Sequence, residues 1–253
     1  MDFTLVKYKK LIEALKEQNY AFQTFNDFII SPKEKVAILR HDVDLLPYNS
    51  LEFAKIQNSH NIRGSYYFRA VPESWDEKVI KEISGLGHEI GYHYECLTTT
   101  NGDLKKGILD FEKNLLALRK LAPVSTICMH GSPMSKHDSK DLWKKYNYKN
   151  YGIIGEPYFD LDFSKIFYLT DTGRRWDGDK VSVRDKVNSG FSFSFHSTED
   201  IIAAIRNDKL PKQIMFTFHP QRWSDSGILW IKELILQNIK NAVKQTFYVK
   251  LEK

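Results

Sequence analysis

Polar residues that can bind a metal ion or transfer a proton follow several short apolar runs of this sequence. They are segments 40–44, 93–95 and 130–133, then Asp171 with Arg175 and Trp176, and finally segment 219–220. Carboxylates and imidazoles are common ligands of divalent ions and common general acids and bases. If the apolar runs are parallel strands, their carboxyl ends meet on one face, where α/β barrels build their active sites. The pattern therefore predicts a metal centre with acid–base groups at strand ends.

Asp42 and Asp44 form an Asp-x-Asp pair just after the apolar run 36–39. Residues i and i+2 of an extended chain point to the same side, which brings the two carboxylates close together. Like charges that close need a cation or a shared proton. A divalent ion bound by Asp44, with Asp42 beside it as a base, meets that need. The alternative is structural: one aspartate caps the next turn or pairs with Arg40.

His93 and Glu95 repeat the i, i+2 spacing after the next polar strand end. Neutral imidazole is the commonest metal ligand in proteins. At a strand end opposite an Asp-x-Asp pair, His93 is expected to bind the ion. Glu95 has three interpretations: a ligand, a carboxylate that orients a ligand histidine, or a structural acid.

His130 and His219 each follow an apolar run and precede a proline-containing turn. A histidine can give up or take a proton near neutral pH, so we expect one of them to be a ligand and the other a general acid. His41 is expected to point away from the acidic pair, because successive side chains of a strand alternate between its faces.

The elements that must position these groups alternate along the chain. Apolar runs at 36–39, 65–68, 88–92, 126–129, 166–170 and 214–218 are typical of strands. Helical spacing marks 5–15, 51–54, 79–86, 104–118, 139–146, 198–205 and 228–243. Ser74 and Glu77 have the spacing of a capping box before the third of these helices.

Strands that alternate with helices predict an α/β fold with a largely parallel sheet. The length suits one (β/α) barrel, so we expect residues 1–253 to form a single domain, a distorted barrel of about seven parallel strands. A doubly wound open sheet is the rival fold. No Gly-x-Gly-x-x-Gly follows the first strand, which disfavours a dinucleotide-binding version. Segment 148–197 is the least regular, and a hairpin or an insertion is expected there.

Composition excludes several classes of protein. The chain has 37 lysines and arginines against 32 aspartates and glutamates, a net charge of +5, without the basic stripe interleaved with aromatics that nucleic-acid binding favours. An apolar fraction of 42% excludes intrinsic disorder. No run approaches the roughly 18 apolar residues of a membrane span, and the N-terminus lacks the apolar stretch of a signal peptide. Two cysteines cannot form a disulfide framework, so a cytoplasmic location is expected.

Taken in order from Lys35 to Trp223, these motifs resemble the polysaccharide deacetylase family, the NodB-like proteins of carbohydrate esterase family 4. The Asp42-Val43-Asp44 segment resembles the first family motif, and segment 87–93 (GHEIGYH) resembles the second. Asp171 with Trp176 resembles the fourth motif, and segment 216–220 (FTFHP) the fifth.

The resemblance implies a distorted (β/α) barrel that hydrolyses an acetyl group on a sugar with the help of zinc or another divalent ion. It assigns Asp42 as general base, Asp44 and His93 as metal ligands, and His219 as general acid. The usual second ligand histidine of the family is Leu97 here. We expect His130 to supply the third ligand, with Glu95 as the competing candidate.

The expected function is removal of an N-acyl group, with acetyl the first choice, from an amino sugar in intracellular polysaccharide or glycoconjugate precursor synthesis. A nucleotide-linked or lipid-linked sugar would be the substrate, and Zn²⁺ the cofactor. Glu95, Asp171, Arg175 and Trp176 are expected to bind substrate or support the ligands. The alternative is a non-catalytic carbohydrate-binding relative that has lost a ligand at Leu97.

Overall fold

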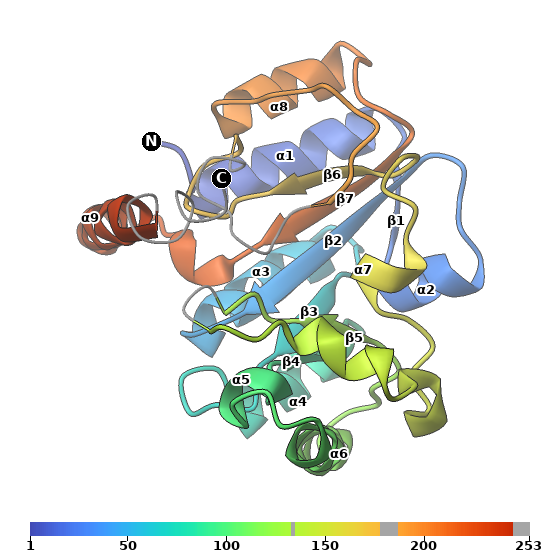
Figure 1. Ribbon diagram of the computed structural model, residues 1–253. Coiled ribbons are helices and arrows are strands. Elements are labelled where there is room, and N and C mark those ends of the chain that lie inside the picture. Colours follow the sequence, from blue (N-terminus) through green and yellow to red (C-terminus); the bar gives the residue numbers. More distant parts are fainter. Residues whose placement is uncertain (133–134, 178–186, 245–253) are drawn as a thin grey trace.

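A parallel β-sheet forms the centre of the computed structural model, which describes residues 1–132, 135–177 and 187–244 (Figure 1). Its strands are β1 (Ala21–Gln23), β2 (Val36–Val43), β3 (Ser65–Phe68), β4 (Glu89–Tyr94), β5 (Ile127–Met129), β6 (Phe167–Thr170) and β7 (Gln213–Phe218). Every pairing between them is parallel, in the order β5-β4-β3-β2-β7-β6, with β1 also on β2. The expected set of about seven parallel strands is therefore confirmed.

The sheet curls into a half-barrel, with β5 and β6 at the ends of its strand order. Strand β2 is the longest, and all eight of its residues are buried. One edge of β2 pairs with β7, while the other pairs first with β1 and then with β3. This arrangement makes β2 the central element of the sheet and fixes the position of the acidic segment at its end.

Helices connect the strands, as parallel pairing requires. The α-helices are α1 (Leu5–Glu17), α2 (Phe25–Ile30), α3 (Pro47–Ser59), α4 (Glu77–Gly85), α5 (Cys96–Thr99), α6 (Leu104–Arg119), α7 (Pro157–Asp160), α8 (Thr198–Arg206) and α9 (Gly227–Lys244). Short 3₁₀ helices are η1 (Ser139–Lys144), η2 (Tyr148–Tyr151) and η4 (Pro220–Arg222). None of the described helices is both long and apolar enough to cross a membrane.

Two hydrophobic clusters lie on opposite faces of the sheet. The larger one contains Ala37 and Leu39 of β2 together with the buried sides of α1, α3, α4, α6 and α8. The smaller one contains Val36 and Ile38 of β2, and we call its side the inner face. Alternation along β2 then carries Arg40 and Asp42 to the inner face, beyond this cluster.

His41 lies on the opposite, helix-covered face, as its place in the strand predicts. Its ring stacks on Tyr66 with centroids 4.1 Å apart, and its Nδ1 lies 3.1 Å from the Ser65 carbonyl oxygen. Burial lowers the pKa of His41 to about 3, so this histidine is a neutral part of the core.

The start of α4 differs from the sequence expectation. Asp76, not Ser74, caps α4 and accepts a hydrogen bond from the Val79 amide at 3.0 Å. The Ser74 hydroxyl instead donates to the carbonyl oxygen of Val43, so it fastens the loop that follows β2. The expected capping box was wrong because a contact distant in sequence takes the serine hydroxyl.

Segment 148–197 contains η2, α7 and β6 among the described residues. Residues 178–186, where part of the expected hairpin or insertion would fall, lie outside them. Sequence patterns did not predict β1 or α2. Both are short, and α2 begins at a capping box between Thr24 and Asp27.

Candidate metal centre and acid–base site

The carboxylate of Asp44 lies at the meeting point of three histidines from different strands. Its Oδ1 is 3.6 Å from Nε2 of His93 in β4 and 3.5 Å from Nε2 of His130, the residue after β5. Its Oδ2 is 3.8 Å from Nε2 of His219, which follows β7. Parallel pairing of these strands brings together residues that lie far apart in the chain.

Asp44 has the features of a metal ligand. Its Oδ1 is buried without a hydrogen-bond partner among the described residues, and its Oδ2 accepts a bond from the Gln221 amide at 3.3 Å. Burial acts to raise the pKa of Asp44, but the nearby histidines, His130 first, outweigh burial and lower it. A buried, ionised oxygen without a donor is costly, so a cation among Asp44, His93 and His130 fits this group.

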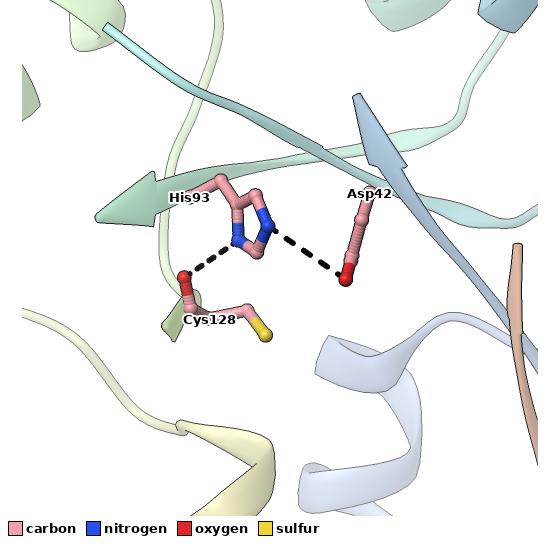
Figure 2. A group of neighbouring side chains, drawn as sticks. All are labelled: Asp42, His93 and Cys128. Atoms are coloured by element: carbon pink, nitrogen blue, oxygen red, sulfur yellow. Dashed lines mark hydrogen bonds and ion pairs between the residues drawn. The ribbon is translucent and has the colours of Figure 1, made fainter. Parts of the chain in front are cut away.

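His93 is held in the tautomer that a metal requires. Its Nδ1 lies 2.9 Å from the carbonyl oxygen of Cys128, which can only accept a hydrogen bond, so Nδ1 carries the proton. Figure 2 shows this contact, with the other ring nitrogen turned toward Asp42. Burial, followed by the charge of His130, lowers the pKa of His93 well below its usual value. A neutral ring with a free Nε2 lone pair is the form that binds metal ions.

Glu95 lies behind His130 and orients it. Its Oε2 is 2.9 Å from His130 Nδ1, and its Oε1 pairs with the Arg69 guanidinium at 2.7 Å. Burial acts to raise the pKa of Glu95, but the hydrogen bond and charge of His130, together with Arg69, lower it to about 2. The carboxylate therefore fixes the tautomer of His130 and leaves Nε2 facing Asp44.

Leu97 occupies the first turn of α5 and is buried in the larger hydrophobic cluster. In this chain, His130 brings an imidazole nitrogen to Asp44 from the neighbouring strand end.

Asp42 forms a second candidate group with His93 and Cys128 (Figure 2). However, both of its carboxylate oxygens accept hydrogen bonds from the Arg40 guanidinium, at 2.8 and 2.6 Å. Arg40 is 1% exposed, and its positive charge opposes a second cation beside it. The Asp44 group is therefore the better cation site, and Asp42 adjoins it with Oδ2 at 3.7 Å from His93 Nε2.

Asp171 and His219 form a buried pair next to Oδ2 of Asp44, whereas His93 and His130 face Oδ1. The Asp171 Oδ1 is 2.5 Å from His219 Nδ1, and the carboxylate also accepts bonds from the Trp223 indole and the Arg222 guanidinium. Burial acts to raise the pKa of Asp171, but the charge of His219 and these donors lower it. The ionised carboxylate directs His219 Nε2 toward Asp44.

Arg175 and Trp176, which the sequence placed in the site, have other partners in the structure. Arg175 forms an ion pair with Asp177 at 2.5 Å. Trp176 is 5% exposed, packs against Phe218 and donates its indole N–H to the Thr198 hydroxyl. Its ring belongs to the hydrophobic core, where it cannot stack on a sugar.

Sequence reasoning missed Cys128 and Arg69, and it treated Arg40 only as a structural partner. Strand alternation gives a signal for Arg40, because it lies two residues before Asp42. Cys128 pairs with His93 in the β4–β5 register, which no local pattern reveals.

Comparisons with known proteins find similar solved structures but no relatives by sequence. No family model and no curated protein matches the chain. Solved structures of carbohydrate esterase family 4 are among those similar to this chain. A Streptococcus mutans esterase of this family matches with 14% identity and a TM-score of 0.45, covering 92% of each chain.

Two further structures match at the same level. The polysaccharide deacetylase Bc1974 from Bacillus cereus has 14% identity and a TM-score of 0.43, with coverage of 82% of this chain and 89% of its own. The pseudoenzyme BA3943 of the same esterase family, from Bacillus anthracis, has 12% identity and a TM-score of 0.44 over 86% of this chain. The match spans 63% of that pseudoenzyme's length.

Proposed function

We propose that the chain is a metal-dependent amide hydrolase that removes an N-acyl group, acetyl in the first instance, from an amino sugar. The observation that carries this proposal is the buried Asp44 oxygen without a hydrogen-bond donor, which faces the ligand nitrogens of His93 and His130. The sugar substrate follows from the motif resemblance between Lys35 and Trp223. Nucleotide-linked and lipid-linked N-acetylamino sugars are the substrates of choice.

Asp44, His93 and His130 would hold the metal ion. One carboxylate and two imidazoles suit zinc, and three protein ligands are the usual number in catalytic zinc sites. A zinc ion bound there would lower the pKa of water and polarise the acyl carbonyl oxygen. The buried Arg40 guanidinium adjoins Asp42, so Asp44, His93 and His130, and not Asp42, would hold the ion.

Asp42 adjoins His93 and His219 adjoins Asp44, so a base and an acid both border the candidate metal site. Asp42 takes a proton from the attacking water, and Arg40 holds its carboxylate in place. The oxygen of that water bonds to the acyl carbon. His219 then gives a proton from Nε2 to the amine nitrogen as the carbon–nitrogen bond breaks. The products are the free amino sugar and the carboxylic acid of the acyl group, which ionises to the carboxylate. Asp42 then loses its proton and His219 regains one by exchange with water, which completes the cycle.

The test combines metal analysis with product analysis on the full chain. Wild type, Asp44→Asn, His93→Ala and the control His196→Ala, whose side chain is 81% exposed, are loaded with zinc and dialysed. Bound zinc is measured, and acetate release is followed with N-acetylglucosamine, its nucleotide-linked form and a lipid-linked form. Wild type and the control are expected to hold about one zinc ion and release acetate. The two site variants are expected to do neither.

Two results would overturn the proposal. If wild type holds no more zinc than Asp44→Asn, the metal centre is wrong. If wild type binds zinc and sugar but releases no acetate, the chain is a non-catalytic carbohydrate-binding protein.

A further inference from the structure

Helix α9 is oriented with polar side chains toward the protein. Gln237 is buried at 4% exposure, and the Asn241 amide donates to the carbonyl oxygen of Gly173 at 2.8 Å. The Trp230 indole donates to the carbonyl oxygen of Asp2 at 2.6 Å. Polar bonds therefore anchor this helix, in contrast to a normal surface helix, which buries its apolar stripe.

The apolar residues of α9 point away from the protein, and the helix lies at the margin of the molecule (Figure 1). We call this surface the outer face of α9. Its members are 42–81% exposed: Ile228, Leu229, Ile231, Ile235, Leu236, Ile239 and Val243. Their spacing by three and four residues aligns them along one side of the helix. Monomeric proteins rarely expose so much contiguous apolar surface without an interaction partner.

The start of the chain adds to this surface. The Val6 amide donates to Asp225, just before α9, and the Ser224 amide donates to the Phe3 carbonyl oxygen. Met1 and Val6 are both more than half exposed. The N-terminal segment therefore places two further exposed apolar residues close to the start of α9.

The charges of the helix differ between its two sides. Lys232 and Lys240 are exposed. Glu233 is half-buried and interacts electrostatically with Arg174. Between Gly227 and Val243, the exposed charges are therefore lysines alone. Lys232 lies within the outer face, four residues after Ile228, and Lys240 lies at its border. An apolar helix face that carries lysines and no acid suits the interface of an anionic membrane.

A second copy of the chain fits this surface less well. A twofold contact places the same face on both sides, so Lys232 would meet an identical apolar and basic surface. No exposed acid of Gly227–Val243 is available there to pair with it, and the nearest exposed acid, Asp225, precedes the helix and accepts a bond from the Val6 amide. An anionic lipid surface accepts both the apolar side chains and the lysines. We propose that the outer face of α9 docks the protein on an anionic membrane surface, with the helix lying in the interface.

The site and α9 are connected through the loop after β6. The loop after β6 carries Asp171, and its next residues reach α9 through two bonds, from Arg174 to the Trp230 carbonyl and from Asn241 to Gly173. Docking through α9 thus holds the His219–Asp171 pair near the lipid surface. This last step rests on the proposed function, whereas docking itself does not.

The test measures co-sedimentation of the full-length protein with vesicles of phosphatidylcholine, with and without phosphatidylglycerol. Wild type is expected to bind the anionic vesicles more tightly, and added salt is expected to weaken binding. The double variant Ile231→Asp/Ile235→Asp is expected to bind at least about tenfold more weakly. Its matched control is Leu109→Asp/Leu116→Asp on α6, which changes two equally exposed leucines far from α9 and is expected to bind as wild type does.

A second variant distinguishes loss of vesicle binding from loss of folding. Lys232→Glu/Lys240→Glu keeps the apolar residues, and it is expected to lower binding to anionic vesicles while thermal unfolding stays unchanged. Absence of wild-type binding, or equal binding by the α9 variants, would refute the proposal. A dimer in sedimentation velocity that Ile231→Asp/Ile235→Asp dissociates, without vesicle binding, would assign the face to a second copy. These assays need neither metal nor turnover, so they stand apart from the test of hydrolysis.

Discussion

Asp171 Oδ1 lies 2.5 Å from His219 Nδ1, so the carboxylate accepts a hydrogen bond from Nδ1 and leaves Nε2 as the ring nitrogen that faces the site. The Asp171 carboxylate forms its hydrogen bonds with His219, Arg222 and Trp223 and not with Asp44, His93 or His130. It is therefore a positioning residue for His219. Its other hydrogen bonds, from Trp223 and Arg222, hold the carboxylate itself in place. This buried chain of contacts gives the sharpest test of the acid–base assignment.

Asp171→Asn is expected to lower kcat by about 10²–10⁴ while KM and bound zinc stay near wild type, because an amide also permits the wrong tautomer of His219. Steady-state kinetics and a pH–rate profile measure the effect. Asp177→Asn is the control, because Asp177 lies in the same segment but pairs with Arg175. An unchanged kcat in Asp171→Asn would remove His219 from the role of general acid.

Glu95→Gln is expected to weaken zinc binding by about 10–100-fold, since Glu95 orients His130 without reaching Asp44. His130→Ala should weaken it further by removing the ligand itself. Competition with a chromophoric chelator measures both affinities. Loss of zinc in Glu95→Ala with retention in His130→Ala would make Glu95 the third ligand instead.

Zinc is expected to raise the thermal unfolding temperature of wild type, because its ligands come together only in the folded chain. At free zinc of roughly 100 times Kd, the added stability is about 2.7 kcal/mol. Differential scanning calorimetry with zinc and with a chelator checks this. Asp44→Asn should show little difference between the two conditions, and an equal rise in that variant would indicate zinc binding elsewhere.

The stability of the fold is expected to fall as the pH drops from about 6.5 toward 3, in part through His41. Burial lowers the pKa of His41 to about 3, whereas an unfolded histidine titrates near 6.5. Between these values the unfolded chain binds the extra proton, so stability is present above pH 6.5 and is lost on acidification, by about 1.4 kcal/mol per pH unit.

His41→Asn should remove this component. Urea unfolding in the presence of a chelator compares the variants at about pH 7 and about pH 5, where wild type should lose about 2 kcal/mol more than the variant. His196→Asn is the control, because the side chain of His196 is exposed. If all three proteins lose the same stability, His41 is not a source of the acid sensitivity.

Sequence reasoning was most informative where a single geometric rule applied. Parallel strands align their carboxyl ends, and this rule alone brought Asp44, His93, His130 and His219 onto one rim. Alternation along β2 correctly turned His41 away from Asp42. Both rules depend only on the backbone, so they need no knowledge of neighbouring side chains.

Side-chain partners were harder to foresee, because they depend on packing between distant segments. Trp176 follows a strand end, yet contacts with Phe218 and Thr198 turn it into the core. Ser74 has the spacing of a cap, yet the Val43 carbonyl oxygen takes its hydroxyl. Helical periodicity identified residues 228–243 as a helix, but it could not show that the apolar side would face outward.

The pairing of β2 with β7 joins residues 36–41 to residues 213–218. During synthesis, one edge of β2 therefore stays unpaired until most of the chain has left the ribosome. Such an edge invites association between nascent chains, and contacts between distant segments slow folding. His219 arrives with β7, immediately after this pairing is complete. The last strand of the sheet in chain order thus also completes the candidate site, and a chain synthesised only as far as β6 cannot bring His219 to Asp44.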